Sequence, residues 1–197
     1  MDNPPKVCSA TPWEVSFIQS IIARHVASKK RGQQVYVEVG SYMGGSLRTY
    51  GGCMPKGSIL VAVDQPHNEQ IADNLIRVSA AMSADGYDSY TVIGNNHAQE
   101  IANQTRDLLE GKKADVLFVD GDHTPEGCEM DLDLYGPLVR PGGLVLMHDC
   151  GFSKGSKPLA PANVPIIAGL HDVWERRSAY KRRFIIQDWA GYGGWWT

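Results

Sequence analysis

Two short stretches of this sequence contain acids and histidines of the kinds that bind a divalent cation or transfer a proton. One is Asp120-Gly121-Asp122-His123 and the other is His148-Asp149, and each directly follows an apolar run. A Mg²⁺ site in a protein commonly uses few carboxylates and leaves positions for water and substrate oxygens. Asp120 and Asp149 therefore predict a divalent-cation site, with His148 as a third candidate ligand. Such an ion would lower the pKa of a bound hydroxyl group.

His123 is the candidate general base for that hydroxyl group. An unperturbed imidazole has a pKa of about 6.5, which suits proton transfer near neutral pH. Two simpler interpretations stay open from the residues alone. In the first, Asp122 and His123 cap a helix that begins near Pro125; in the second, His148 hydrogen-bonds to a ligand without contacting the ion.

A glycine-rich turn earlier in the chain predicts a cofactor crevice. Residues 35–39 form a β-branched run that contains Glu38, and Gly40-Ser41-Tyr42-Met43-Gly44-Gly45-Ser46 follows it. Glycines at such a turn let a ligand approach the backbone, and Gly40 and Gly44 can take positive φ angles at little cost. A second apolar run ends at Asp64, where this type of fold places the acid that holds ribose hydroxyls. The alternative for Asp64 is a surface turn before Pro66.

The charge of the glycine-rich turn favours one class of cofactor. A dinucleotide fingerprint would read G-x-G-x-x-G, whereas here a carboxylate, Glu38, lies beside the expected ligand position. Glu38 would repel a pyrophosphate and attract an amino group. The sign of the charge therefore favours S-adenosylmethionine over NAD or ATP.

The elements that must position these residues alternate regularly. Strands are expected at 35–39, 59–63, 90–93, 115–119, 144–147 and 184–186, with a last strand or tail at 191–196. Between them, helices are expected after Thr11-Pro12, where the first helix should cover one edge of the sheet, after Gly44, and at 68–83, 97–109, 125–135 and 166–174. Pro141-Gly142-Gly143 is expected to form a turn. This alternation predicts an α/β fold: a doubly wound, mostly parallel, seven-stranded Rossmann-like sheet with helices on both faces.

Residues 151–165 interrupt the alternation. A stretch of about 15 residues without secondary structure is long for a compact domain, which favours a lid loop over the crevice rather than a plain connection. The segment that ends the chain is aromatic, with Trp189, Tyr192, Trp195 and Trp196. Three roles stay open for these side chains: packing in the core, contact with substrate, or the contact of a homodimer.

Composition sets broader limits. A chain of 197 residues with 43% hydrophobic residues fits a single domain, residues 1–197. The net charge of -3 gives no general attraction to phosphate backbones, so no nucleic-acid partner is expected. The four cysteines lack C-x-x-C spacing, which favours a reducing, cytoplasmic setting. No apolar run approaches the roughly 18 residues of a membrane span, so no membrane partner is expected.

Several of these motifs, taken in order, resemble known families. Residues 37–46 resemble the cofactor motif of the catechol O-methyltransferase family. Asp120-Gly121-Asp122-His123, together with the stretch from Pro141-Gly142-Gly143 to His148-Asp149, resembles the macrolide-sugar O-methyltransferases and the related group named for cephalosporin hydroxylase. The resemblance covers roughly residues 35 to 150 and is weaker from Trp174 to the end.

The resemblance implies a role for each matching residue. In the cofactor site, Glu38 would hold a ribose or amino-acid group and Asp64 the ribose hydroxyls. The methionine moiety would lie along the turn that contains Gly40, Ser41, Tyr42, Gly44 and Ser46, and the adenine beside Asn96 and His97. Asp120, which also borders the cofactor, matches a metal ligand, as does Asp149, and His123 matches the general base. Two positions depart from the families: Cys150 replaces an amide ligand of the catechol enzymes, and His148 replaces a carboxylate of the sugar enzymes.

Together these observations predict methyl transfer from S-adenosylmethionine to a hydroxyl group of a small molecule, with or without the help of Mg²⁺ or another divalent cation. Two alternatives belong to other classes. One is a nicotinamide-dependent oxidoreductase, which Glu38 and the missing G-x-G-x-x-G disfavour. The other is a non-catalytic scaffold protein that binds the cofactor.

Overall fold

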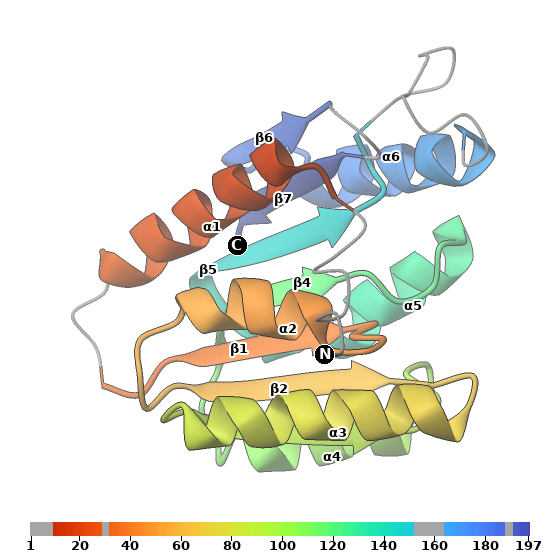
Figure 1. The fold of residues 1–197 in the computed structure, drawn as a ribbon. Helices are drawn as coiled ribbons and strands as arrows, with labels where there is room; N and C mark the ends of the chain where they lie inside the picture. The colour runs from red at the N-terminus through yellow and green to blue at the C-terminus, as the bar shows by residue number, and fades with distance from the viewer. Residues whose placement is uncertain (1–9, 29–31, 152–163, 188–190) are drawn as a thin grey trace.

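A seven-stranded β-sheet forms the centre of the computed structural model, which describes residues 10–28, 32–151, 164–187 and 191–197 (Figure 1). The strand order is β3-β2-β1-β4-β5-β7-β6. The pairs among β1 to β5 are parallel, and β7 runs antiparallel to β5 and β6. The predicted doubly wound, mostly parallel sheet is confirmed. The strands are β1 (Val35–Val39), β2 (Ile59–Asp64), β3 (Asp88–Ile93), β4 (Ala114–Val119), β5 (Val139–His148), β6 (Arg183–Ile186) and β7 (Tyr192–Trp196).

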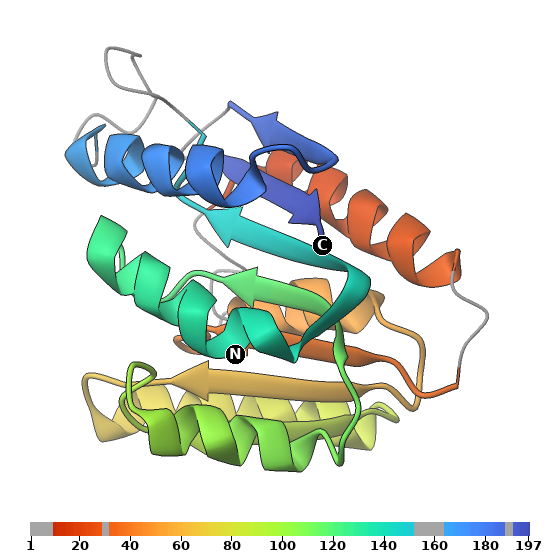
Figure 2. The same ribbon diagram turned by 180° about the vertical axis from the view of Figure 1, so that it is seen from behind.

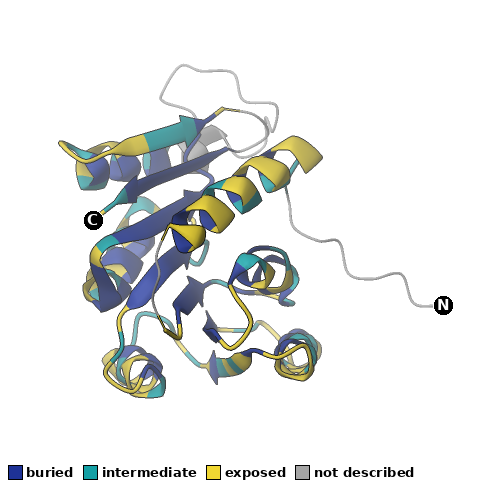
Figure 3. Ribbon diagram, turned by 90° about the vertical axis from the view of Figure 1, so that its left-hand side faces the viewer, coloured by how far each residue is buried: buried dark blue, intermediate teal, exposed yellow. Residues whose placement is uncertain are grey.

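Helices cover both faces of this sheet, as predicted. One face carries α1 (Pro12–Ala27), α2 (Gly45–Tyr50) and α3 (Glu69–Ala84), and Figure 2 shows the other with α4 (Gln99–Leu108), α5 (Pro125–Tyr135) and α6 (Val164–Ser178). Short 3₁₀ turns follow α2 (Gly51–Cys53) and α5 (Gly136–Leu138). Side chains alternate along each strand, so Tyr36 packs toward the first face and Val37 toward the second. Two apolar cores result, and the strands between them are buried while the outer helix surfaces are exposed (Figure 3).

The helix starts follow the capping signals in the sequence. Thr11 forms a capping box with Glu14, and Asn68 and Thr124 accept hydrogen bonds from the first turns of α3 and α5. Helix α4 begins at Gln99, two residues after the predicted start. Helix α1 covers the side of the sheet that ends at the edge strand β6: Ile18 and Ile22 belong to the same core as residues of β5 and β7, and Phe17 packs against Phe184 of β6.

The predicted turn at Pro141-Gly142-Gly143 is wrong, because these residues lie inside β5. The register between β4 and β5 shifts there, from Ala114 opposite Val139 to Val116 opposite Leu144. A bulge tolerates proline and a positive φ, and Gly142 has a φ of 71°. The bulged backbone is paired with the last residue: Gly142 N–H donates to the Thr197 carbonyl and Thr197 N–H to the Gly143 carbonyl.

The aromatic C-terminal segment forms β7, in the interior of the sheet. Tyr192 and Trp195 are buried, so core packing is the role that the structure supports for them. Trp189 and residues 152–163 of the predicted lid loop lie outside the described residues. A search of the described helices finds none that is both long and apolar enough to cross a membrane.

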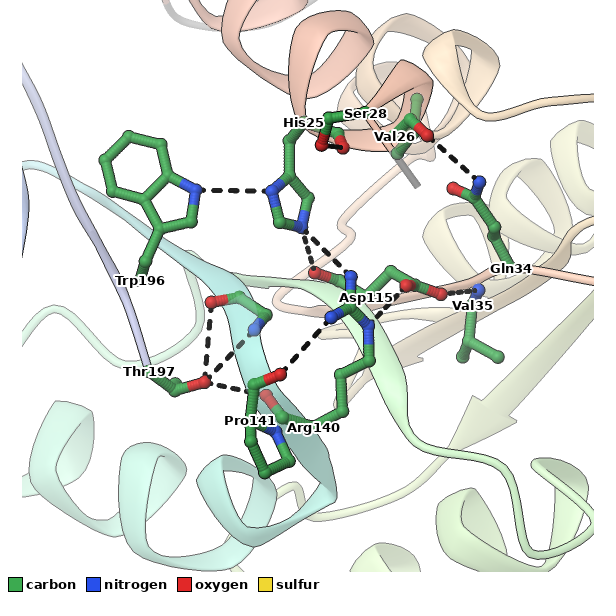
Figure 4. A network of polar contacts seen from close by, with 11 residues as sticks. His25, Val26, Ser28, Gln34, Val35, Asp115, Arg140, Pro141, Trp196 and Thr197 are labelled. Atoms are coloured by element: carbon green, nitrogen blue, oxygen red, sulfur yellow. Dashed lines mark hydrogen bonds and ion pairs between the residues drawn. The ribbon is translucent and has the colours of Figure 1, made fainter. Parts of the chain in front are cut away.

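A buried polar network ties α1, β4, β5 and β7 together at the end of the sheet where β4 begins (Figure 4). The Arg140 Nε atom donates to Asp115 Oδ1 at 2.5 Å, and both side chains are nearly fully buried. His25 Nε2 lies 3.1 Å from the Asp115 carbonyl oxygen, and the Trp196 indole N–H donates to His25 Nδ1 at 3.2 Å. Since the indole can only donate, His25 carries its proton on Nε2.

Candidate active site

The predicted site residues lie at the carboxyl ends of the parallel strands, with the glycine-rich turn after β1 and the predicted metal and base residues after β4 and β5. The chain leaves β1 toward β2 on one side and returns at β4 on the other, so β1 and β4 border the switch point where open α/β sheets bind ligands. Asp120 directly follows β4, and its backbone N–H donates to the Val39 carbonyl at the end of β1. His148 ends β5 and Asp149 follows it.

Two acids and two histidines form what we call the carboxylate–histidine cluster: Asp120, His123, His148 and Asp149. The Nδ1 atom of His148 lies 3.0 Å from Asp120 Oδ1 and 3.4 Å from Asp149 Oδ1. The Nε2 atom of His123 lies 3.5 Å from Asp120 Oδ1 and 3.6 Å from Asp149 Oδ2. His148 is buried and His123 is exposed, so His123 is the histidine that a substrate can reach.

The cluster shifts the acid–base properties of its members. Burial by itself would raise the pKa of Asp120, but His148 and His123 outweigh burial and lower that pKa to about 2. Burial would lower the pKa of His148, but Asp120 and Asp149 raise it to about 9. The hydrogen bond to Asp120 raises the pKa of His123. At neutral pH the cluster therefore holds an ionised Asp120 beside a protonated His148.

The arrangement can also hold a divalent cation. One ligand atom from each of Asp120, His123 and Asp149 lies within 4.8 Å of the others. His148, the predicted third ligand, is also within reach of both carboxylates, and its role as a ligand stays a prediction. Its Nδ1 contacts the two carboxylates, and its ring packs 4.4 Å from the centre of the Tyr192 ring.

Cys150 is directed away from this cluster. Its thiol is fully buried and lies 3.5 Å from the Met147 carbonyl oxygen, among residues of the core that α5 and α6 cover. Burial raises the pKa of the thiol well above its ordinary value, so the neutral form persists at physiological pH. Cys150 therefore does not supply the ligand that the amide gives in the catechol enzymes.

The glycine-rich turn packs directly against the loop that carries Asp120. Gly40 has a φ of 87°, and a Cβ atom there would lie 2.0 Å from the Asp120 carbonyl oxygen and 2.5 Å from the Gly121 Cα. Gly44 has a φ of 83° and precedes α2, with Val78 against it. The glycines therefore serve packing and backbone conformation. Tyr42 and Asp149 also adopt positive φ angles, 47° and 54°, a strain that often marks functional sites.

Glu38 lies beneath the turn. Its side chain is fully buried and accepts hydrogen bonds at 2.5 Å from the Tyr36 hydroxyl and the Ser46 hydroxyl. Burial raises the pKa of Glu38 to about 7 even though these hydrogen bonds favour the ionised form. Ser41 is buried beside the same carboxylate. Direct contact of Glu38 with a cofactor remains a prediction, since its carboxylate is occupied by the turn in this structure.

Asp64 lies at the end of β2, as predicted. Its carboxylate accepts a hydrogen bond from the backbone N–H of Tyr42, which links the ends of β1 and β2. Burial raises the pKa of Asp64, and the negative charge of Asp120 raises it further. Tyr42 is exposed beside it.

Asn96 and His97 contact a residue that sequence reasoning missed. The Asn96 amide donates to Asp131 Oδ1 at 2.6 Å, and His97 Nε2 lies 3.4 Å from the same atom. Asp131 is on α5 and is fully buried. Helical spacing places Asp131 with Cys128 and Tyr135 on the buried face of that helix. An acidic residue within an apolar stripe was therefore the feature of the sequence that could have pointed to Asp131.

Comparison with known proteins gives a match over the part of the chain that contains these residues. A family model described as a methyltransferase domain matches residues 37–150, more than half of the chain and the part that contains the turn and the whole carboxylate–histidine cluster. The chain belongs to this methyltransferase family. An uncharacterized protein of Acanthamoeba polyphaga mimivirus is 27% identical to it over 137 residues, which cover 68% of the chain and 60% of that relative.

Solved structures share the fold of this chain. The O-methyltransferase TomG from Streptomyces achromogenes, determined in complex with SAM, superposes with a TM-score of 0.62 and 18% identity, covering 97% of this chain and 80% of TomG. An O-methyltransferase from Bacillus cereus in complex with SAH gives a TM-score of 0.60 and 18% identity, covering 96% and 83%. These likenesses confirm the predicted Rossmann-like fold of the methyltransferase.

Proposed function

We propose that this methyltransferase transfers a methyl group from S-adenosylmethionine to a hydroxyl group of a small molecule. The observation that carries the proposal is the convergence of an exposed histidine and two carboxylates at the switch point of the sheet, next to the glycine-rich turn. His123 Nε2 lies within ion-pair distance of both Asp120 and Asp149. Two proteins of the same fold support it, the O-methyltransferase TomG in complex with SAM and the Bacillus cereus O-methyltransferase in complex with SAH.

The charge of the site suits this cofactor. Glu38, Asp64 and Asp120 lie at the ends of three adjacent strands, and the charge of Asp120 contributes to raising the pKa of the other two. Such a negative site favours a ligand with positive charges and disfavours a pyrophosphate. S-adenosylmethionine supplies an electrophilic methyl group on a positively charged sulfonium. We propose that the turn around Gly40, Ser41, Tyr42, Gly44 and Ser46 borders its methionine moiety, Asp64 its ribose, and Asn96 and His97 its adenine.

The chain's own residues would align the acceptor and remove its proton. We propose that His123 takes the hydroxyl proton on Nε2 and that Asp120 and Asp149, which lie 3.5 and 3.6 Å from that atom, stabilise the imidazolium that results. The raised pKa of His123 makes it a stronger base, but it also keeps more of the residue protonated at neutral pH. Proton removal should therefore become more efficient as the pH rises through the pKa of His123.

A divalent cation is compatible with the same residues. Asp120, Asp149 and His123 would hold it, and it would lower the pKa of an acceptor hydroxyl. His123 uses one atom, Nε2, for both roles, so it is either the base or a ligand in any one complex. A set with an imidazole suits Mn²⁺ or another transition metal better than Mg²⁺, which prefers oxygen ligands.

Calorimetric titration with S-adenosylhomocysteine tests the proposal, with Mg²⁺, Mn²⁺ or no metal present, and with NAD as the control ligand. Saturable binding of S-adenosylhomocysteine without binding of NAD is the expected result. A metal dependence that disappears in Asp149→Asn would support the cation site. Binding of NAD alone would favour the oxidoreductase, and binding of neither would overturn the cofactor assignment.

Three further points are proposals of the same kind. We propose that residues 1–197 act as one catalytic domain. A cytoplasmic setting fits the cysteine pattern, since Cys53, Cys128 and Cys150 are free thiols. A homodimer would be tested by light scattering of the purified protein.

A further inference from the structure

A fully buried carboxylate on α5 joins two loops that border the candidate active site. Asp131 Oδ1 accepts a hydrogen bond from the Asn96 amide at 2.6 Å, and His97 Nε2 is 3.4 Å from it. Asp131 Oδ2 accepts from the backbone N–H of Asp122 at 3.4 Å. Asn96 and His97 belong to the loop between β3 and α4, whereas Asp122 belongs to the loop that carries Asp120 and His123.

The packing around this carboxylate is close. A Cβ atom at Gly121 would lie 2.7 Å from Asp131 Oδ2 and 3.3 Å from the Asn96 amide nitrogen, so the β4–α5 loop lies directly against the contact. The Tyr135 hydroxyl, one turn further along α5, donates to the Asn96 carbonyl at 3.0 Å. Asn96 is thus held by α5 through both its side chain and its backbone.

Helix α4 adds no side-chain cap to the β3–α4 loop, within which Asn95 Oδ1 accepts from the His97 backbone N–H at 3.0 Å. Ala98 is the N-cap of α4 and cannot make a side-chain cap, whereas α1, α3 and α5 all have one. A buried carboxylate is costly unless hydrogen-bond donors surround it. Asp131 therefore constrains the positions of Asn96 and Asp122 more strongly than a neutral side chain would.

We infer that Asp131 is a positioning residue that holds the β3–α4 loop, with Asn96 and His97, in place for the nucleoside half of the cofactor. This inference rests on the proposed function, because it needs a nucleoside to bind beside Asn96 and His97. The Asn96 contact is the main one, since it is short and charge-assisted, while the Asp122 contact is long. The effect should therefore fall on cofactor affinity more than on the methyl-transfer step.

The first test is the affinity for S-adenosylhomocysteine, measured by calorimetry on the full chain. Asp131→Asn keeps the shape of the side chain but removes its charge and replaces an acceptor by a donor. We expect its dissociation constant to rise about tenfold or more. Asp133→Asn is the matched control, because Asp133 lies on the same helix with an exposed side chain paired to Arg177, and it should bind as the wild type does.

A charge swap separates positioning from a general loss of structure. Asn96→Asp places a second carboxylate opposite Asp131. The repulsion between the two should also weaken binding of S-adenosylhomocysteine. The double variant Asn96→Asp with Asp131→Asn again pairs an amide with a carboxylate, and we expect it to recover most of the lost affinity. Recovery of this kind is not expected from damage to the helix. With any acceptor that the wild type methylates, kcat at saturating cofactor should change less than about threefold, because the residues of the carboxylate–histidine cluster are untouched.

The outcomes distinguish this inference from the proposed function. If the wild type fails to bind S-adenosylhomocysteine, the proposed function fails. If the wild type binds and Asp131→Asn binds equally well, the positioning role is refuted. Equal weakening in Asn96→Asp and in the double variant also refutes it, because Asn96 would then act independently of Asp131. If Asp131→Asn does not fold, the double variant decides: affinity restored above that of Asn96→Asp supports the inference, and affinity no better than that of Asn96→Asp refutes it.

Discussion

Replacing Gly40 by alanine should destabilise the protein strongly, because two separate costs coincide there. At a φ of 87° an L-residue costs about 1–2 kcal/mol. The new Cβ would also lie 2.0 Å from the Asp120 carbonyl oxygen and 2.3 Å from its carbon, which are backbone atoms that cannot rotate away. Overpacking of this kind typically costs about 1–3 kcal/mol. We expect a total loss of about 2–5 kcal/mol in the free energy of unfolding, a large part of a typical stability of about 5–15 kcal/mol.

Gly57→Ala is the matched control for this prediction. Gly57 has a φ of 80°, but a Cβ atom there would meet nothing within 4 Å. Its substitution should therefore cost only the conformational part, about 1–2 kcal/mol. Urea unfolding of the wild type and both variants, followed by circular dichroism, gives the two differences directly.

The difference between the two variants measures how tightly the glycine-rich turn packs on the β4–α5 loop. Gly40→Ala should also weaken binding of S-adenosylhomocysteine, because the loops at the ends of β1 and β4 must separate to admit the methyl group. Equal destabilisation by Gly40→Ala and Gly57→Ala would refute the reasoning, because it would mean that the glycine-rich turn and the β4–α5 loop accommodate a Cβ atom between them without cost.

Three other predictions concern catalysis, pH and the buried network. His123→Ala should lower kcat about 10²- to 10⁴-fold with little change in S-adenosylhomocysteine affinity; an unchanged rate in a methyl-transfer assay would exclude His123 as the base. Burial raises the pKa of Glu38 from 4.5 to about 7, so the folded protein prefers the protonated carboxyl group. The stabilisation that this preference gives is fully present below pH 4.5 and is lost as the pH rises to 7. As the pH rises from 4.5 to 7, the free energy of unfolding of Glu38→Gln, measured in urea, should increase by about 3 kcal/mol relative to that of the wild type. A difference that stays constant with pH would contradict the raised pKa of Glu38. Arg140→Met should cost about 3–5 kcal/mol because it leaves Asp115 buried without its cationic partner. Lys112→Met, which breaks an exposed pair with Glu110, should cost under about 1 kcal/mol in the same measurement; equal costs would show that Asp115 finds other donors.

The secondary structure was largely predictable because each element has a local cause. Apolar runs such as residues 35–39 and 114–119 can only be buried strands when helices flank them. The helix starts at Thr11, Asn68 and Thr124 carry their own capping side chains. The error at Pro141-Gly142-Gly143 has the opposite cause. Proline and glycine are typical of turns, but the backbone of Gly142 and Gly143 is hydrogen-bonded to Thr197, more than fifty positions later in the chain.

The sequence by itself determined the fold class, the family and the sheet edge at which the acids and histidines meet. Strand ends are set by the order of apolar runs and glycines, and parallel strands bring their carboxyl ends to the same edge. Only the tertiary structure decided which neighbours those side chains contact. It placed both His123 and His148 against the two carboxylates, His123 exposed and His148 buried, turned Cys150 into the core, and buried Glu38 under the turn. It also brought Asp131 to Asn96. Distances and burial depend on residues remote in the chain, and therefore spacing along the sequence does not contain them.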